Sequence, residues 1–193
     1  AKSIQIQRGV GTTTYGTGSF GGNINILTKA LTKESYLNSK NSFGSFNSFR
    51  NTIEFGTGLI NKHWTLDGRL SSINSDGYID RAASDLESYF LQGAYVDDNT
   101  LIKALVFGGH EITYQSWNGV EDWQIEQYGR TFNSAGAIYD EDENVVDYYD
   151  NEVDDYKQDH FQLHWNEQVS ANWNTNLAIH YTRGRGFFEQ YRQ

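Results

Sequence analysis

The sequence predicts an all-β fold that forms part of an antiparallel transmembrane β-barrel. The 193 residues include no proline, and proline is excluded from paired strands because it lacks the backbone N–H that a ladder needs. The chain is instead rich in residues that strands favour, with 13 Tyr, 11 Phe and 5 Trp. Apolar and polar residues also alternate in several segments, which is the period of a strand whose two faces meet different surroundings.

The alternating segments give the expected strands in chain order: residues 23–28, 49–59, 64–71, 86–96, 100–114, 160–166 and 173–182. One face of these strands is apolar and is expected to face lipid, with Phe55, Leu66, Leu163 and Ile179 as examples. The other face is polar and is expected to face the lumen, with Glu54, Arg69, His164 and His180 as examples. Such alternation is the signature of a membrane barrel, but a soluble β-sandwich could also produce it.

The connections between the strands favour the barrel over the sandwich. Tight turns are expected near Asn61, Asp98 and Ala171, and much longer connections near Asp80 and Glu143. Outer-membrane barrels have short periplasmic turns and long external loops, with aromatic girdles at both interfaces. Trp64 and Trp173 each follow a tight turn directly, which is where the inner girdle would lie.

The acidic segment 118–157 is expected to be a long external loop. It contains twelve acidic residues and two basic ones, and this difference of −10 equals the net charge of the whole chain. No basic patch exists, so a nucleic-acid partner is not expected. The loop is interpreted either as a solvated connection or as a surface-exposed, mobile segment that captures a ligand. The candidate capture residues are aromatic: Trp123, Tyr128, Tyr139, Tyr148 and Tyr149.

The glycine-rich stretch near the start matches two known patterns. Residues 16–21 fit G-x-G-x-x-G, but a dinucleotide site needs a helix to follow, and an alternating strand pattern follows instead. The longer pattern is Ile4-x-Ile6-x-Arg8-Gly9, then Tyr15-Gly16, then Gly21-Gly22-x-Ile24-Asn25-Ile26. It resembles the end of the plug domain of TonB-dependent outer-membrane receptors, with Ile6 at a position usually held by Val. The glycines are then expected to form tight turns and close backbone packing.

The resemblance implies an organisation and a function. Residues 1–30 would be the C-terminal end of a plug domain, and residues 31–193 about the first seven strands of the barrel, so the chain is expected to be a fragment. The plug residues carried by the motif are Arg8, Gly9, Tyr15, Gly16, Gly21, Gly22 and Asn25. Such receptors lie in the outer membrane of Gram-negative bacteria, contact its lipid, and actively import a scarce solute.

The energy for import would come from the TonB–ExbB–ExbD complex, acting through a part of the plug that this sequence lacks. The expected solute is a small molecule or metal chelate, namely an iron-siderophore, haem or cobalamin. A glycan-importing receptor of the same family and a soluble or adhesive β-sandwich binding module remain alternatives. No enzymatic activity, cofactor or bound metal is expected.

Overall fold

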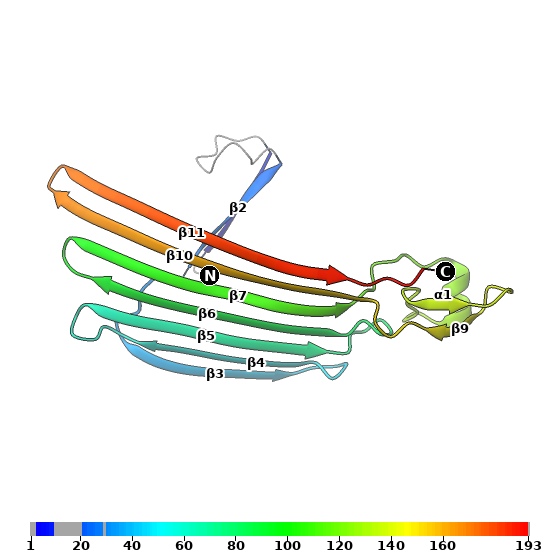
Figure 1. Ribbon diagram of the computed structural model, residues 1–193. Coiled ribbons are helices and arrows are strands. Elements are labelled where there is room, and N and C mark those ends of the chain that lie inside the picture. The colour runs from blue at the N-terminus through cyan, green and yellow to red at the C-terminus, as the bar shows by residue number, and fades with distance from the viewer. Residues whose placement is uncertain (1–2, 10–20, 29, 193) are drawn as a thin grey trace.

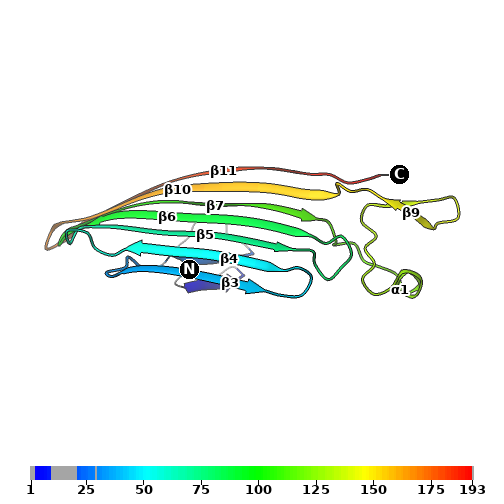
Figure 2. The same cartoon turned by 90° about the horizontal axis from the view of Figure 1, so that it is seen from below.

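The computed structural model describes residues 3–9, 21–28 and 30–192, and the described chain is built mainly from strands (Figure 1). The main element is one seven-stranded antiparallel sheet in which every strand pairs with its neighbours along the chain. Its strands are β3 (Ser35–Phe43), β4 (Phe49–Thr57), β5 (Trp64–Ser75), β6 (Ser84–Val96), β7 (Thr100–Tyr114), β10 (Val153–Ser170) and β11 (Trp173–Phe188). The predicted all-β class is therefore confirmed, and the sheet is bowed along its strands (Figure 2).

A separate two-stranded hairpin precedes the sheet. It consists of β1 (Ser3–Arg8) and β2 (Gly22–Leu27), which pair antiparallel with each other. The strand expected over residues 23–28 is confirmed as β2. In Figure 1 the hairpin runs at a steep angle to the strands of the sheet. Ile26 and Thr28 line a cavity together with residues of the sheet, among them Asp67 in β5 and Gln92 in β6.

The long connection between β7 and β10 has secondary structure of its own. It contains helix α1 (Asp122–Tyr128) and a small hairpin of β8 (Ala137–Tyr139) and β9 (Val145–Tyr148). Figure 1 places all of these beyond one end of the sheet, beside the end of β11. The three-residue turn between β6 and β7 lies at the opposite end.

The strands expected from alternation are present, although several are longer than the pattern indicated. The strand expected over 100–114 matches β7, whereas β5 extends to Ser75 and β10 begins at Val153, inside the acidic segment. Apart from Val153 and Tyr156, the extension of β10 is polar on both faces, so apolar alternation could not reveal it. It is held by continuous pairing to β7 and β11.

Two glycines inside strands allow aromatic rings to lie flat on a neighbouring strand. A Cβ atom added at Gly68 would lie 2.4 Å from the ring of Phe55, and one at Gly56 would lie 2.3 Å from the ring of Tyr36. Real Cβ atoms are not found at such distances from a ring. Each ring therefore occupies the space that a side chain would otherwise take, so each glycine is needed for a close approach.

Candidate functional site

The cross-strand register sorts the sheet residues into two faces, because directly opposed residues point to the same side. We call the first the apolar face. One of its rows is formed by Leu37, Phe55, Gly68, Leu91, Val106, Phe161 and Tyr181. The next row includes Leu66, Gly93, Ala104, Leu163 and Ile179. These side chains are largely exposed, with 75% of Leu37 and 55% of Ile179 accessible to solvent.

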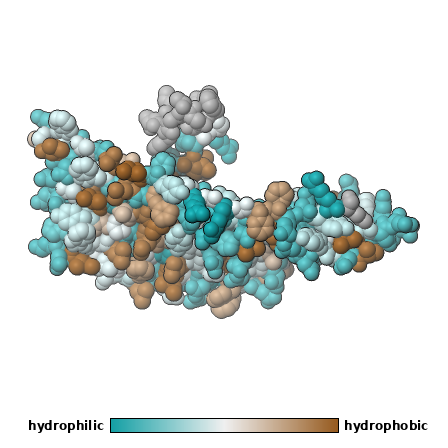
Figure 3. All heavy atoms as spheres, viewed as in Figure 1, coloured by the Kyte–Doolittle hydropathy of each residue, from teal (hydrophilic) through white to brown (hydrophobic). Residues whose placement is uncertain are grey.

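The apolar face is bounded at both ends of the strands. Towards the tight turns, the row of Trp64, Tyr95 and Trp165 adds aromatic rings, and the Trp64 and Tyr95 ring centroids are 4.9 Å apart. Towards the long loop, an entirely polar row crosses the sheet: Asn41, Asn51, Ser72, Glu87, His110, Lys157 and Arg185. Figure 3 shows hydrophobic residues gathered over the strands, while the loop end is mainly hydrophilic. The result is an apolar band of limited height with polar margins.

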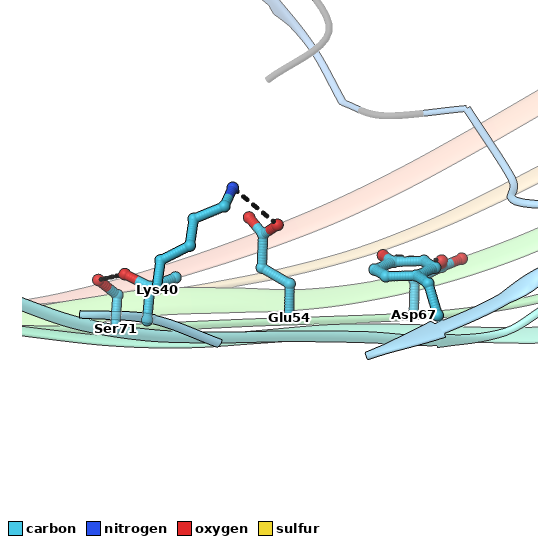
Figure 4. A network of polar contacts seen from close by, with 6 residues as sticks. Lys40, Glu54, Asp67 and Ser71 are labelled. Carbon is cyan, nitrogen blue, oxygen red and sulfur yellow. Dashed lines mark hydrogen bonds and ion pairs between the residues drawn. The ribbon is translucent and has the colours of Figure 1, made fainter. Parts of the chain in front are cut away.

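The opposite side, which we call the polar face, is the better buried of the two. Thr52, Thr65, Asp67 and Gln92 all lie on it and are all buried. Glu54 forms an ion pair with Lys40 at 3.5 Å, and the hydroxyls of Thr52 and Ser71 are 2.9 Å apart. Figure 4 shows the side chains of Lys40, Glu54 and Asp67 rising from the same side of the sheet. This arrangement reverses that of a soluble sheet, which buries its apolar side.

The predicted partition of residues between the two faces is confirmed. The register places Glu54, Arg69, His164 and His180 on the polar face. It places Phe55, Leu66, Leu163 and Ile179 on the apolar face. Their expected surroundings, lumen and lipid, remain predictions.

Asp67 is the centre of a polar cluster that sequence reasoning did not identify. Its carboxylate accepts hydrogen bonds from the hydroxyls of Thr32 at 2.6 Å, Tyr36 at 3.3 Å and Thr65 at 3.5 Å. Tyr36 reaches Asp67 across Gly56, which is opposed to both residues in the register. A Cβ at Gly56 would lie 2.7 Å from the Asp67 Oδ1 atom as well as against the Tyr36 ring. The glycine thus makes the hydrogen bond between β3 and β5 sterically feasible.

A cavity of about 380 Å³ lies beside this cluster, between the polar face and the segment that follows β2. Its lining includes Thr28 from that segment and, from the sheet, Asp67, Arg69, Gln92 and Phe107. Gln92 is directly opposed to Asp67 in the register. The cavity therefore joins residues that are far apart in the sequence, so no local motif could have predicted it.

The described residues of the glycine-rich pattern lie in the β1–β2 hairpin or directly beside its strands. Arg8 is opposed to Gly22 at the end of the hairpin, and Gly9 donates a backbone hydrogen bond to Gly21 O at 3.1 Å. Gly9 has φ +78°, and a Cβ at Gly22 would lie 2.5 Å from Gln7 O, which agrees with the expected turn and close-packing roles. At Gly21 a Cβ would meet no described atom within 4 Å, so no close packing is seen there.

The remaining pattern residues add less. Asn25 lies in β2, opposed to Gln5. Tyr15 and Gly16 lie outside the described residues. The stretch between the two halves of the pattern therefore gives no test of the expected glycine roles, whereas Gly9 and Gly22 do.

The acidic loop has secondary structure of its own and is anchored to the rest of the chain. Phe132, Asn133, Ala135 and Glu152 are buried within it. Its main anchor is Arg81 in the β5–β6 connection, whose guanidinium lies 3.5 Å from the centre of the Tyr148 ring and donates to the Asn133 and Ala135 carbonyl oxygens. The two connections are thereby joined, and this packing restricts the loop.

Most of the candidate capture residues are engaged in that internal packing. The ring of Tyr128 stacks on Phe132 at 4.6 Å, and the hydroxyl of Tyr149 donates to Glu189 at 2.8 Å. The ring of Tyr148 packs against the guanidinium of Arg81, and Tyr139 lies half-buried in β8. Only Trp123, which is 46% exposed on α1, presents a large aromatic surface among the five.

Directly before the acidic segment lies an exposed aromatic residue that the prediction did not include. Trp117, just before α1, is 66% exposed. An aromatic count over the segment could not separate rings that fill the loop from rings that face solvent.

On the side of the loop that packs against the end of β11, hydrogen bonds from Asn151 and Tyr149 hold the pKa of Glu189 below its ordinary value.

The described parts of the chain contain no group of three or more His, Asp or Glu side chains that could hold a metal ion. Among the same residues, no helix has the length and apolar character needed to cross a membrane. No model of a known protein family matches the chain, and no curated protein matches it.

Proposed function

We propose that the chain is part of a TonB-dependent outer-membrane transporter, with residues 1–30 as the end of its plug and residues 31–193 as its first barrel strands. The observation that carries this proposal is the reversal of the sheet, whose apolar face is exposed while its polar face is buried. An apolar surface of this extent is rare on a soluble monomer. It suits a barrel wall, which presents apolar residues to lipid and polar residues to the lumen.

Two further features support the proposal. The apolar band ends in aromatic residues at the tight turns and in a polar row towards the long loop, as expected for periplasmic and external boundaries. The hairpin that carries the glycine-rich pattern lies on the side of the polar face, where Ile26 and Thr28 line a cavity with sheet residues. A plug inside a lumen would contact the wall on that face. Outer-membrane lipid and the TonB–ExbB–ExbD complex are then the partners.

The proposed solute is a scarce, large molecule taken up at the cell surface. The glycine-rich pattern favours an iron-siderophore, haem or cobalamin over a glycan. The acidic loop disfavours anionic ligands through its negative potential. Trp123, exposed on that loop, and Trp117, exposed directly before it, are the aromatic side chains most available for the first contact.

The proposal is tested by locating the whole protein in cells and measuring uptake. We expect it in the outer-membrane fraction, with uptake of the solute that depends on TonB. Recovery from the soluble fraction would instead favour a β-sandwich whose apolar face packs on a second sheet. Residence in the outer membrane with uptake of a glycan, but of no iron chelate or cobalamin, would assign the glycan-importing branch.

A further inference from the structure

Asp67 is a buried carboxylate whose hydrogen-bond donors are all neutral. Its side chain is one of the least accessible in the sheet, with 6% exposure, and it accepts from the hydroxyls of Thr32, Tyr36 and Thr65. Within the described residues, the carboxylate makes no ion pair with a lysine, arginine or histidine. A buried charge is costly unless it is paired. Among the described residues, no basic side chain therefore neutralises this carboxylate.

Gln92 provides a second, independent observation at the same place. It is directly opposed to Asp67 and only 1% exposed, and its Oε1 atom has no hydrogen-bond partner among the described residues. A buried acceptor without a donor is uncommon in folded proteins. Asp67 and Gln92 line the same cavity, so one ligand carrying both a positive charge and an N–H group would satisfy both.

The other walls of the cavity suit such a ligand. Three aromatic rings line it, those of Tyr36, Phe90 and Phe107, and ring faces attract cations. A second carboxylate, that of Glu54, also lines the cavity and holds Lys40 at 3.5 Å. Among the described lining residues, the one cationic side chain is that of Arg69, which donates to Ser88 at 3.4 Å. Ser88 is opposed to Ser71, so along the strands it lies on the far side of Arg69 from Asp67. The contact with Ser88 therefore directs the guanidinium away from Asp67.

We propose that this cavity binds a protonated primary amine. The ammonium would lie against the Asp67 carboxylate, one N–H would donate to Gln92 Oε1, and the rings would enclose its carbon chain. At about 380 Å³ the cavity exceeds a simple alkyl amine, so the amine is one arm of a larger solute. That role in solute recognition rests on the proposed transport function, whereas binding of the amine itself does not.

The test is calorimetric titration of the whole protein in detergent micelles at neutral pH, where an alkyl amine is protonated. We expect n-butylammonium to bind and butan-1-ol, its uncharged counterpart, not to bind. Asp67→Asn should weaken ammonium binding by about 30-fold or more, as loss of one partner of a buried charge pair does. The matched control is Asp98→Asn in the exposed β6–β7 turn, which should leave binding unchanged.

A second variant keeps the proposal testable if Asp67→Asn fails to fold. Gln92→Leu removes the unpartnered oxygen from a buried site, so stability should be kept or raised. Ammonium binding should nevertheless weaken by roughly 12-fold to 160-fold, the worth of one hydrogen bond from a charged donor. Equal binding of butylammonium and butanol, or ammonium binding that Gln92→Leu leaves unchanged, would overturn the proposal. Solute uptake without amine binding would contradict this site alone, while amine binding by a protein outside the outer membrane would contradict only the transport function.

Discussion

Leu163 and His164 are adjacent in β10 but lie on opposite faces of the sheet, so the same substitution at each compares the two faces directly. Leu163 is on the apolar face, opposed to Ala104 and Ile179. It stands between Trp165, in the aromatic row, and Phe161, so it occupies the middle of the apolar band. His164 is opposed to Lys103 on the polar face. We expect arginine to be poorly tolerated at Leu163 and tolerated at His164.

The magnitude follows from the position of each residue. Arginine in the middle of a lipid-facing band costs about 2–4 kcal/mol, which changes the unfolding equilibrium by about 30-fold to 900-fold. At His164 the new charge adds repulsion from Lys103 across a polar face, for which we expect about 1 kcal/mol or less. The two variants should therefore differ by at least about 1 kcal/mol, a margin that equilibrium measurements resolve.

The measurement is urea-induced unfolding of the whole protein in lipid vesicles, followed by tryptophan fluorescence. Leu163→Ala is the control, because it removes the same apolar contacts without adding a charge. The reasoning fails if Leu163→Arg and His164→Arg shift the unfolding midpoint equally. It also fails if Leu163→Arg is no less stable than Leu163→Ala, since the apolar face would then not be in contact with lipid.

Three further changes test the structure. Gly56→Ala should cost about 1–3 kcal/mol of unfolding free energy, because the added methyl group forces the Tyr36 ring and Asp67 apart. The control Gly93→Ala should cost far less, because a Cβ there would meet only Leu66 at 3.9 Å. Equal losses in urea titrations would refute the close-approach argument. Arg81→Ala should release the loop and speed its proteolysis at low protease concentration while the sheet stays folded, and the exposed Arg130→Ala should not; similar cleavage rates would show that Arg81 is no anchor. Hydrogen bonds from the backbone N–H groups of Asn99 and Thr100 lower the pKa of Asp97 from its ordinary value of 3.8. The Asp97 carboxylate therefore stabilises the folded state above pH 3.8, and this stabilisation is lost as the pH falls through the lower pKa of the folded state. Asp97→Ala should therefore flatten the acid limb of thermal stability relative to Asp98→Ala, and parallel acid limbs would contradict the assignment.

Alternation made six of the seven strands of the sheet and their faces accessible to sequence reasoning, because a period of two is a local property, whereas β3 was not expected. β7 and the starts of β5 and β11 follow directly from it. The extension of β10 from Val153 does not, since its residues are mostly polar on both sides and only its pairing to β7 and β11 defines it.

The candidate site depends on register, which sequence alone specifies poorly. Tyr36 and Asp67 are 31 positions apart and meet only because β3, β4 and β5 pair in one particular alignment. Similarly, nothing in the order of the residues distinguishes Tyr148, which packs on Arg81, from Trp123, which faces solvent. The type of residue was predictable, but its neighbours were not.

The folded loop also bears on how the sheet forms. Each strand pairs with its predecessor, so the sheet can grow one hairpin at a time through local contacts. Closure over the three residues between Val96 and Thr100 is easy, but the connection from Tyr114 to Val153 spans residues 115–152, which is 38 residues. Chain-entropy scaling makes closing that longer loop costlier by about 2 kcal/mol.

The contacts of Arg81 with Asn133, Ala135 and Tyr148 act against this cost. We expect these contacts to gather the connection before β10 pairs, which would leave a shorter distance to close between β7 and β10. The residues that anchor the loop would then also serve the order of assembly. Loosening them should slow the pairing of β10 with β7 more than the pairing of any earlier strand.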